Sequence, residues 1–396
     1  MIKRLQDADL AGKRVLVRVD FNVPMKNGSV SDDTRLRAAV PTIQYLREQG
    51  AKTLLAAHFG RPKGQRNLEM SLAPVATPLA ELIDHDVKFV MATTGEDAKA
   101  AAATLHPGDV LLLENTRFDA REEKNDPSFA AELAELADIY VNDAFSAAHR
   151  AHASTQGVAK VLPGFAGLAL QSEIDHVSAA LDQPKKPLLA IVGGSKVSTK
   201  IALLKNLVAK VDQLFVGGAM ANTFLAARGV SVGSSLQERD FHEVALEIET
   251  AAKAAGCEIL LPVDGVFATE FKASADYRTA PVDDIAGNEM MLDCGPQTVA
   301  MLSKAMDDAA TLVWNGPLGA FETEPFDAAT VAAAKHAAAL CHAGQLVAVA
   351  GGGDTVAALN HAEVSDQFTF VSTAGGAFLE WLEGKALPGI EALKAE

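Results

Sequence analysis

The residues best suited to chemistry form a glycine-rich run that ends in an acid, Gly351-Gly-Gly-Asp-Thr355. Apolar residues precede the run and an Ala/Val/Leu-rich stretch follows it, a pattern that predicts a buried strand, a turn and a helix. A first helical turn favours an anion such as phosphate. Asp354 would repel a bare phosphate, but Mg²⁺ between the two groups removes the conflict. Glycine-rich turns also occur without any ligand, so this run alone leaves both interpretations open.

The arginines are the second chemically suited group, and eleven of the fourteen precede residue 151. A guanidinium group binds carboxylate and phosphate through paired hydrogen bonds. Arg61, Arg117 and Arg150 follow predicted strands, and Arg35 begins a predicted helix. A single arginine usually forms a surface ion pair, but several at one sheet edge predict a pocket for a small polyanion. His149 and His152 lack a third metal ligand nearby, which favours packing over a metal site.

Glycines and lysines in the later part of the chain indicate a nucleotide. Lys196 and Lys200 follow Gly193-Gly194 and are expected on one face of a starting helix, although the P-loop spacing is absent. Further predicted strands end in Gly217-Gly218, in Trp314-Asn-Gly-Pro317 followed by Glu322, and in Ser372-Thr-Ala-Gly-Gly376. These strand ends, two lysines and Asp354 together fit a Mg²⁺-nucleotide. A dinucleotide fingerprint fails because Val356 stands where glycine or alanine is needed.

Composition restricts the class of protein. The 396 residues are 49% hydrophobic and carry a formal net charge of −16 without a basic run, which argues against nucleic acid and anionic membranes as partners. Cys257, Cys294 and Cys341 are far apart and read as reduced core thiols. The first residues are charged and lack the apolar segment of a signal peptide. We therefore expect a soluble cytoplasmic protein.

Alternating strands and helices must position these residues. Expected strands cover residues 14–19, 53–58, 110–113, 139–142, 188–192, 214–216, 258–261, 311–314, 346–350 and 368–371, and expected helices cover 34–49, 72–83, 128–137, 167–181, 197–209, 219–227, 241–255, 296–305, 328–341, 355–359 and 376–383. This order predicts an α/β protein of two doubly wound (Rossmann-like) three-layer domains with mainly parallel sheets. The shift in composition and the restart of the strand and helix pattern predict a boundary near residue 170, with domains 1–170 and 171–383. Ligands bind outside the carboxyl ends of such strands.

An arginine pocket in one half and a nucleotide site in the other imply phosphoryl transfer between them. No general base stands out, although a hydroxyl acceptor usually requires one. A carboxylate acceptor, with a pKa of about 4, is already ionised and needs none. Catalysis would then consist of positioning and charge neutralisation by Lys, Arg, Mg²⁺ and helix N-termini. Domain closure would exclude water.

Seven motifs closely resemble those of the phosphoglycerate kinase family and occur in the family's order over essentially the whole chain. They are Arg18-Val-Asp-Phe-Asn-Val-Pro24, His58-Phe-Gly-Arg-Pro62, Glu114-Asn-Thr-Arg-Phe118, His149-Arg-Ala-His152, Gly193-Gly-Ser-Lys-Val197, Trp314-Asn-Gly-Pro317 and Gly351-Gly-Gly-Asp-Thr355. The resemblance implies reversible, Mg²⁺-dependent transfer between 1,3-bisphosphoglycerate with ADP and 3-phosphoglycerate with ATP in glycolysis. It also implies a hinge-bending monomer, with a hinge helix between the domains and the tail 384–396 packed on the N-terminal domain.

The resemblance also implies roles for matched residues. Substrate would contact Asp20, Phe21, Asn22, Arg35, His58, Phe59, Gly60, Arg61, Arg117 and Arg150. Nucleotide would contact Gly193, Lys196, Lys200, Gly217, Gly218, Asn315, Glu322, Gly351, Gly352, Gly353, Asp354 and Thr355. Arg35, Lys196, Lys200, Gly351 and Gly375 would be catalytic, and Asp354 would bind Mg²⁺. Small departures from the family pattern occur at Ser195, Ala320 and Ala374, and the last bears on the backbone of one phosphate loop.

Three alternatives differ in their chemistry. A dehydrogenase is disfavoured by the failed dinucleotide fingerprint. Another carboxylate kinase would share the transfer chemistry but would not predict the arginine pocket. A non-catalytic module that binds phosphorylated metabolites would explain the arginines but would leave Lys196, Lys200 and Asp354 without a role.

Overall fold

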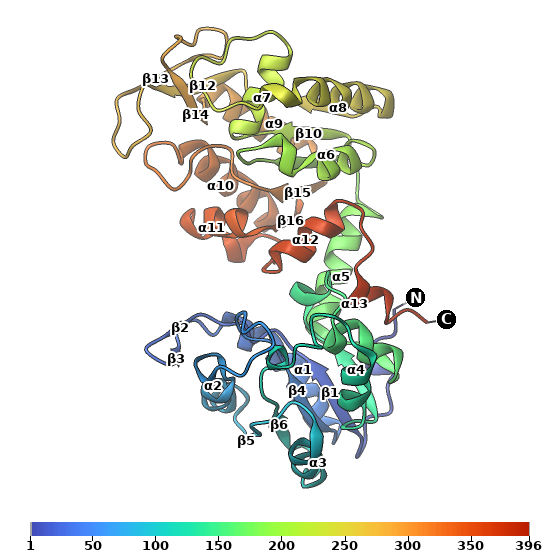
Figure 1. The fold of residues 1–396 in the computed structure, drawn as a ribbon. Helices are drawn as coiled ribbons and strands as arrows, with labels where there is room; N and C mark the ends of the chain where they lie inside the picture. The colour runs from blue at the N-terminus through green and yellow to red at the C-terminus, as the bar shows by residue number, and fades with distance from the viewer. Residues whose placement is uncertain (1, 396) are drawn as a thin grey trace. The chain divides into compact units, whose positions relative to one another are not determined.

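The computed structural model describes residues 2–395, which divide into two compact units (Figure 1). Unit 1 runs to Asp175 and also includes the residues from Ala386 on, and unit 2 is His176–Lys385. The division falls inside helix α5 (Leu168–Leu181). The boundaries expected from the sequence were residues 170 and 383.

Unit 1 is built on a six-stranded parallel sheet in the order β5-β6-β4-β1-β7-β8. Its strands are β1 (Arg14–Arg18), β4 (Lys52–Ala56), β5 (Val87–Phe89), β6 (Val110–Leu112), β7 (Ile139–Asn142) and β8 (Gly164–Ala166), with a hairpin of β2 (Met25–Lys26) and β3 (Ser29–Val30). Its helices are α1 (Thr34–Glu48), α2 (Ala73–Ile83), α3 (Gly95–Ala103), α4 (Pro127–Ala134), the first part of α5, and α13 (Pro388–Glu391). The central strand β1 pairs in parallel with both β4 and β7, so that Leu16 lies beside Leu54 and Tyr140. The carboxyl ends of these three strands therefore meet at one edge.

The last residues of the chain pack against this same unit. The Lys3 N–H donates to the Leu393 carbonyl at 3.3 Å, and the Gly389 N–H donates to the Ala148 carbonyl at 2.9 Å. The buried Asn142 amide donates to the Gly389 carbonyl at 3.2 Å. These bonds attach α13 to β7 and the segment that follows it, and Leu393 to the first residues of the chain.

Unit 2 contains a second parallel sheet, in the order β11-β10-β9-β15-β16-β17. Its strands are β9 (Leu188–Val192), β10 (Gln213–Val216), β11 (Glu258–Leu260), β15 (Thr311–Asn315), β16 (Val347–Gly351) and β17 (Phe370–Ser372). Its helices are α6 (Ile201–Val208), α7 (Ala219–Ala227), α8 (His242–Ala255), α9 (Pro296–Asp308), α10 (Ala328–His342), α11 (Gly353–His361) and α12 (Gly375–Leu382). Numbered within the sheet, this order is 3-2-1-4-5-6, the doubly wound order that reverses between β9 and β15. Right-handed crossovers then place helices on opposite faces on either side of that point.

The doubly wound α/β fold with mainly parallel sheets is confirmed, and several elements differ from expectation. A separate antiparallel sheet of β12 (Asp264–Ala268), β13 (Tyr277–Pro281) and β14 (Met290–Cys294) was not predicted. The short elements β5, β8 and α3 were also missed. The helix expected over 197–209 is instead a 3₁₀ turn, Val197–Thr199, followed by α6, because the backbone leaves the helical region at Lys200, where φ is −128°.

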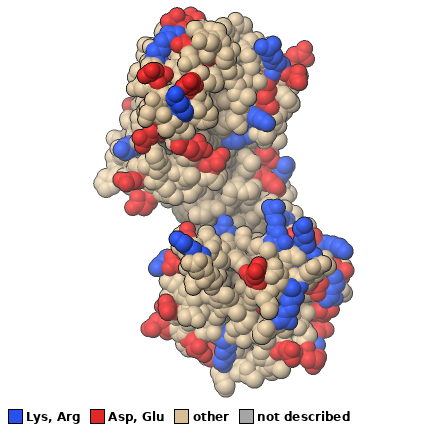
Figure 2. Space-filling view, turned by 60° about the vertical axis from the view of Figure 1, so that its left-hand side comes forward, with Lys and Arg blue, Asp and Glu red and all other residues tan. Residues whose placement is uncertain are grey.

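No helix within residues 2–395 is long and apolar enough to cross a membrane. Figure 2 shows acidic and basic side chains interspersed over the visible face, with neutral surface between them. This distribution agrees with the absence of a basic run in the sequence.

Candidate functional site

Cationic side chains gather at the carboxyl edge of the unit 1 sheet. Arg18 closes β1 and is only 1% exposed, and half-buried His58 follows β4. Arg117 lies in a 3₁₀ turn after β6, and Arg150 follows β7. Burial, and after it the positive charges of Arg18, Arg117 and Arg150, hold the pKa of His58 well below its ordinary value of 6.5. The structure thus brings together at one histidine charges that are far apart in the sequence.

Two asparagine amides hold the loops that carry this cluster. The Asn115 carbonyl oxygen accepts from the N–H groups of Phe59 and Arg117, each at 3.1 Å, and its amino group donates to the Phe59 carbonyl at 2.7 Å. The Asn22 carbonyl oxygen accepts from the Gly60 N–H at 2.9 Å. The loop after β4 is therefore held at Phe59 by Asn115 and at Gly60 by Asn22, whose side-chain oxygen already accepts one hydrogen bond.

Arg35 projects from the first turn of α1 and pairs with Asp20. One Arg35 amino group lies 3.0 Å from an Asp20 carboxylate oxygen and donates to the Asn22 carbonyl at 2.9 Å. Ser146 donates to the same carboxylate at 2.5 Å. The Arg35 side chain is 34% exposed and so remains open to a ligand.

Two predicted substrate residues occupy different surroundings from the others. Phe21 is completely buried in the core of unit 1, so its ring is unavailable and only its main chain could face a ligand. Arg61 is exposed, in contrast to the buried Arg117. The predicted substrate residues therefore include buried side chains, such as Phe21 and Arg117, and one long exposed side chain, Arg61.

In unit 2 the ends of β9, β10 and β15 crowd together where the sheet order reverses. A Cβ atom on Gly193 would overlap the Pro317 carbonyl oxygen, and one on Gly218 would lie 2.6 Å from the Gly194 carbonyl oxygen. Gly218 also has a φ of +65°. Glycine is needed at these positions to let main chains approach, whether or not a ligand binds.

Gly218→Ala is expected to lower the free energy of unfolding of unit 2 by about 1–3 kcal/mol, because the added methyl meets main-chain atoms. Gly229→Ala is the matched control, since Gly229 has a φ of +86° and nothing within 4 Å of an added Cβ. Urea unfolding followed by tryptophan fluorescence reports unit 2, which contains both Trp314 and Trp381. Equal losses in the two variants would contradict this account of Gly218.

Lys200 lies at the same edge and contacts two loops. Its ammonium group donates to the Gly193 carbonyl at 2.6 Å and to the Asn315 side-chain oxygen at 2.7 Å. Burial lowers the pKa of Lys200 to about 8, an effect that the negative charge of Asp354 opposes. Lys196 is exposed and precedes the 3₁₀ turn. The expectation that both lysines share one face of an α-helix is therefore wrong, because no helix spans them.

The first turns of α11 and α12 lie side by side near this lysine. A Cβ on Gly375 would sit 3.4 Å from the Gly353 nitrogen. The Asn315 amide donates to the Gly351 carbonyl at 2.8 Å, and buried Thr355 accepts from the Gly316 N–H at 2.7 Å. Two helix N-termini and one ammonium group thus face the same region, an arrangement that favours phosphate. Asn315 and Thr355 hold the loops that form it.

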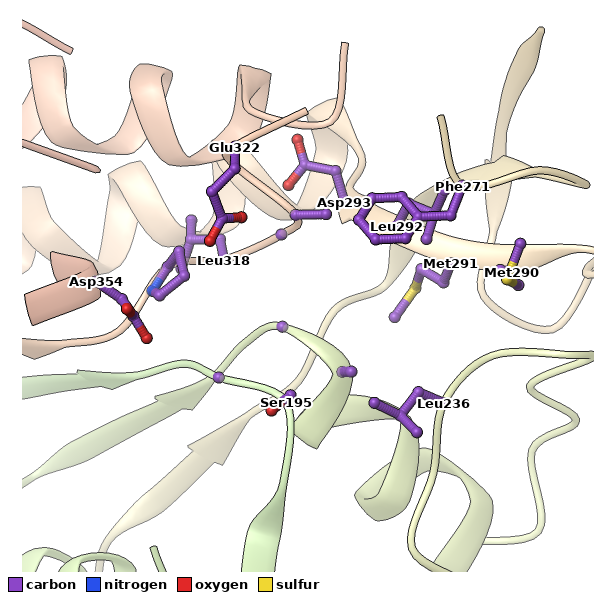
Figure 3. A pocket seen from close by; sticks show the side chains of 16 residues that line it. Ser195, Leu236, Phe271, Met290, Met291, Leu292, Asp293, Leu318, Glu322 and Asp354 are labelled. Carbon is purple, nitrogen blue, oxygen red and sulfur yellow. The ribbon is translucent and has the colours of Figure 1, made fainter. Parts of the chain in front are cut away.

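A pocket of ≈ 360 Å³ adjoins this region and has a polar end and an apolar end (Figure 3). Glu322, Asp354 and Ser195 border one part of it. Leu318 lies beside Glu322 and Asp354, and the apolar part is lined by Leu236, Phe271, Met290, Met291 and Leu292. Ligand pockets commonly combine such an apolar lining with a few polar groups. Gly218 and the Gly194 turn also line the pocket.

Sequence reasoning missed most of the apolar lining. Met290, Met291 and Leu292 lie on β14, which belongs to the unpredicted antiparallel sheet. Asp293 on the same strand accepts from the Ala329 N–H at 2.9 Å, and burial raises its pKa to about 8. The sequence carries no motif for these positions. Phe271 is an exposed aromatic residue, but its exposure is visible only in the structure.

Asp354 is the natural candidate for binding a cation. It is an exposed carboxylate in the first turn of α11, and its negative charge raises the pKa of Lys200, against the effect of burial. Among residues 2–395 no three His, Cys, Asp or Glu side chains gather as a complete metal site. A single carboxylate beside a phosphate-binding region nevertheless fits Mg²⁺, which keeps its waters and takes most remaining ligands from phosphate oxygens.

Comparison with known proteins agrees with the geometry of both units. The family model described as phosphoglycerate kinase matches residues 5–385. The phosphoglycerate kinase of Maricaulis maris is 65% identical, with 99% of this chain and 97% of that protein covered, and that of Zymomonas mobilis is 61% identical, with 98% of each covered. The solved structure of phosphoglycerate kinase from Coxiella burnetii superposes with a TM-score of 0.93 at 44% identity, over 99% of each chain. The chain belongs to the phosphoglycerate kinase family.

Proposed function

We propose that this protein catalyses reversible phosphoryl transfer between ATP and 3-phosphoglycerate, with ADP and 1,3-bisphosphoglycerate as the other pair, as a step of glycolysis. The observation that carries the proposal is the convergence of Arg18, Arg117 and Arg150 on half-buried His58, which favours an anionic ligand although Glu122 and Glu123 offset part of the positive charge. Family membership identifies the activity class, a phosphotransferase with a carboxyl group as acceptor. We further propose that the protein acts as a cytoplasmic monomer, as the resemblance to the phosphoglycerate kinase family implies.

The unit 1 cluster would bind the acceptor. His58, Arg61, Arg117 and Arg150 would hold the phosphate that is not transferred, with the main chain of Phe59 and Gly60 lining the loop. Asp20 and the Asn22 region would contact the hydroxyl of the glycerate. Arg35, fixed by Asp20, would face the acceptor carboxylate and the moving phosphoryl group.

Unit 2 would bind the nucleotide. The apolar part of the pocket, with Gly217 and Gly218, suits the adenine, and Glu322 suits the ribose hydroxyls. Lys196, Lys200 and the N–H groups at Gly351–Gly353 and Gly375 would neutralise the phosphates. Asn315 and Thr355 are assigned an indirect role, because their polar atoms hold the surrounding loops. Asp354 would bind the Mg²⁺ that accompanies the nucleotide and supplies further positive charge.

The chemistry needs no general base. The acceptor carboxylate is ionised at neutral pH, so one of its oxygens attacks the terminal phosphorus directly and the bond from phosphorus to the bridging oxygen breaks. Arg35 and Lys200 would stabilise the negative charge spread over the transferring group. Direct transfer requires the two bound ligands to approach within bonding distance, so we propose that the catalytic state is a closed one.

A coupled assay with ATP, Mg²⁺ and 3-phosphoglycerate tests the proposal. Turnover that depends on all three is expected. Turnover of a different carboxylate, with none of 3-phosphoglycerate, would favour another carboxylate kinase. Binding of phosphoglycerate without any turnover would favour a non-catalytic module.

The lowered pKa of Lys200 predicts a pH dependence at the nucleotide site. Lys200 is charged below pH 8 and loses its proton above it, so kcat/KM for ATP should fall by roughly tenfold per pH unit above that point. The experiment measures kcat/KM for ATP from pH 6 to 9.5 at saturating 3-phosphoglycerate. Lys200→Arg keeps its charge throughout and should give a flat profile at a lower rate. A flat profile for the unaltered protein would contradict the prediction.

A further inference from the structure

Behind the cation cluster lies a fully buried network in which Arg18 contacts two residues without a role in the proposed function, Glu122 and Ser154. Arg18, Glu122 and Ser154 are each at most 1% exposed. Arg18 Nε donates to the Ser154 hydroxyl oxygen at 2.9 Å. The Ser154 hydroxyl donates to one Glu122 oxygen at 2.5 Å, and the Ser154 N–H donates to the other at 2.9 Å. A buried cation and a buried carboxylate are therefore joined through one hydroxyl.

Burial raises the pKa of Glu122, and the charge of Arg18 and the hydrogen bonds from Ser154 oppose that rise. With Glu122 ionised, these groups have a single arrangement of protons. An arginine only donates and an ionised carboxylate only accepts, so the Ser154 hydroxyl must accept from Arg18 and donate to Glu122. At its other end Arg18 contacts His58 Nδ1 through an amino nitrogen at 2.8 Å. Because Arg18 cannot accept, His58 Nδ1 must be the acceptor. The proton of neutral His58 is then on Nε2.

The charges around His58 favour the same state. The pKa of His58 lies well below its ordinary value because of burial and then because of Arg18, Arg117, Arg150 and His152. His58 is therefore neutral at physiological pH. A neutral ring with a proton on Nε2 can still donate to an anionic oxygen, whereas the opposite tautomer would present a lone pair to it.

We propose that Glu122 and Ser154 are positioning residues that fix the orientation of Arg18 and, through it, the Nε2-protonated tautomer of His58. This inference rests on the proposed function for the identity of the anion, 3-phosphoglycerate, but not for the tautomer. Glu122 also offsets the charge of Arg18, while Arg117 pairs with Glu123 at 3.2 Å. Loss of the network should therefore weaken binding of phosphoglycerate and leave the nucleotide site unaffected.

Nitrogen NMR of histidine-labelled protein tests the tautomer without any need for activity. The His58 signals are assigned by their loss in His58→Gln. The unaltered protein should show a protonated Nε2 and an unprotonated Nδ1 at pH 7. In Ser154→Ala the hydroxyl link is removed at constant charge, so the ring should show a mixture of tautomers. A protonated Nδ1 in the unaltered protein would overturn the proposal.

Kinetics separate a positioning role from a purely structural one. Ser154→Ala and Glu122→Gln should each raise KM for 3-phosphoglycerate roughly five- to tenfold, the loss expected for one buried hydrogen bond to a charged group. Values of kcat and of KM for ATP should stay within about twofold. Ser154→Thr, which keeps the hydroxyl, should recover part of the loss.

Thr298→Ala is the matched control, because Thr298 is equally buried and its hydroxyl donates to the buried Asp264 carboxylate at 2.7 Å in unit 2. It should lower thermal stability without changing KM. If Ser154→Ala behaves in the same way and retains the His58 tautomer, Glu122 and Ser154 are structural only. If the unaltered protein fails to turn over 3-phosphoglycerate, the proposed function fails, and the NMR result still decides the tautomer.

Discussion

Arg35→Ala is expected to lower kcat by roughly 10²–10³-fold. This is the usual effect of removing one hydrogen-bond donor that stabilises the negative charge developing in a transition state. Arg35 is 34% exposed and held by Asp20 and the Asn22 carbonyl, so its guanidinium group is oriented before a ligand binds. Alanine is a good helix former at the first turn of α1. The fold should therefore survive, and KM for ATP should be unchanged.

Arg37→Ala is the matched control for Arg35. Arg37 lies two positions later on α1, is 64% exposed and pairs with Asp33. The Arg37→Ala substitution removes the same charge from the same helix but leaves the contact between Arg35 and Asp20 intact, so kcat should stay within about twofold. Steady-state kinetics and circular dichroism on both variants give the comparison. A similar kcat in Arg35→Ala and Arg37→Ala would show that Arg35 takes no part in transfer.

The parallel sheets were predictable because most of their strands are short apolar runs that end at glycine or polar residues, a pattern visible in the sequence alone. The stretch Leu188–Val192 is apolar throughout and ends in two glycines, and the structure places β9 at those same residues. The antiparallel strand β13, Tyr277–Pro281, alternates between exposed and partly exposed positions, and Pro281 and Ala280 are poor strand residues. Its pairing with β12 depends on contacts made after folding, so local patterns did not reveal it.

Individual site residues were easier to predict than their partners. Arg117 and Lys200 stand at strand ends, where the fold class alone places ligands. Which groups hold them depends on contacts far apart in the sequence: Arg18 reaches Ser154 across 136 residues and Lys200 reaches Asn315 across 115. No periodicity encodes such pairs. Nor does the sequence distinguish Arg18, which ends β1 and is buried, from Arg14, which begins the same strand and is partly exposed.

Lys200→Met is expected to lower kcat/KM for ATP by roughly 10²–10³-fold. The methionine side chain keeps most of the apolar length of the lysine and removes only the ammonium group. That group contacts the Gly193 carbonyl and the Asn315 side chain and lies in the field of Asp354, where the phosphates are proposed to bind. Its loss leaves Asp354 facing the phosphates with less compensating charge.

Lys205→Met is the control for this substitution. Lys205 lies on α6, is 51% exposed and pairs with Glu247, so the same chemical change there should leave the rate within about twofold. A structural effect of Lys200→Met is separated from an electrostatic one by pH. The unaltered protein should lose activity above pH 8 as Lys200 is deprotonated, whereas Lys200→Met should have no such loss, because the titrating group is gone. If the variant retained that limb of the profile, the limb would belong to another group, and the role assigned to Lys200 would be wrong.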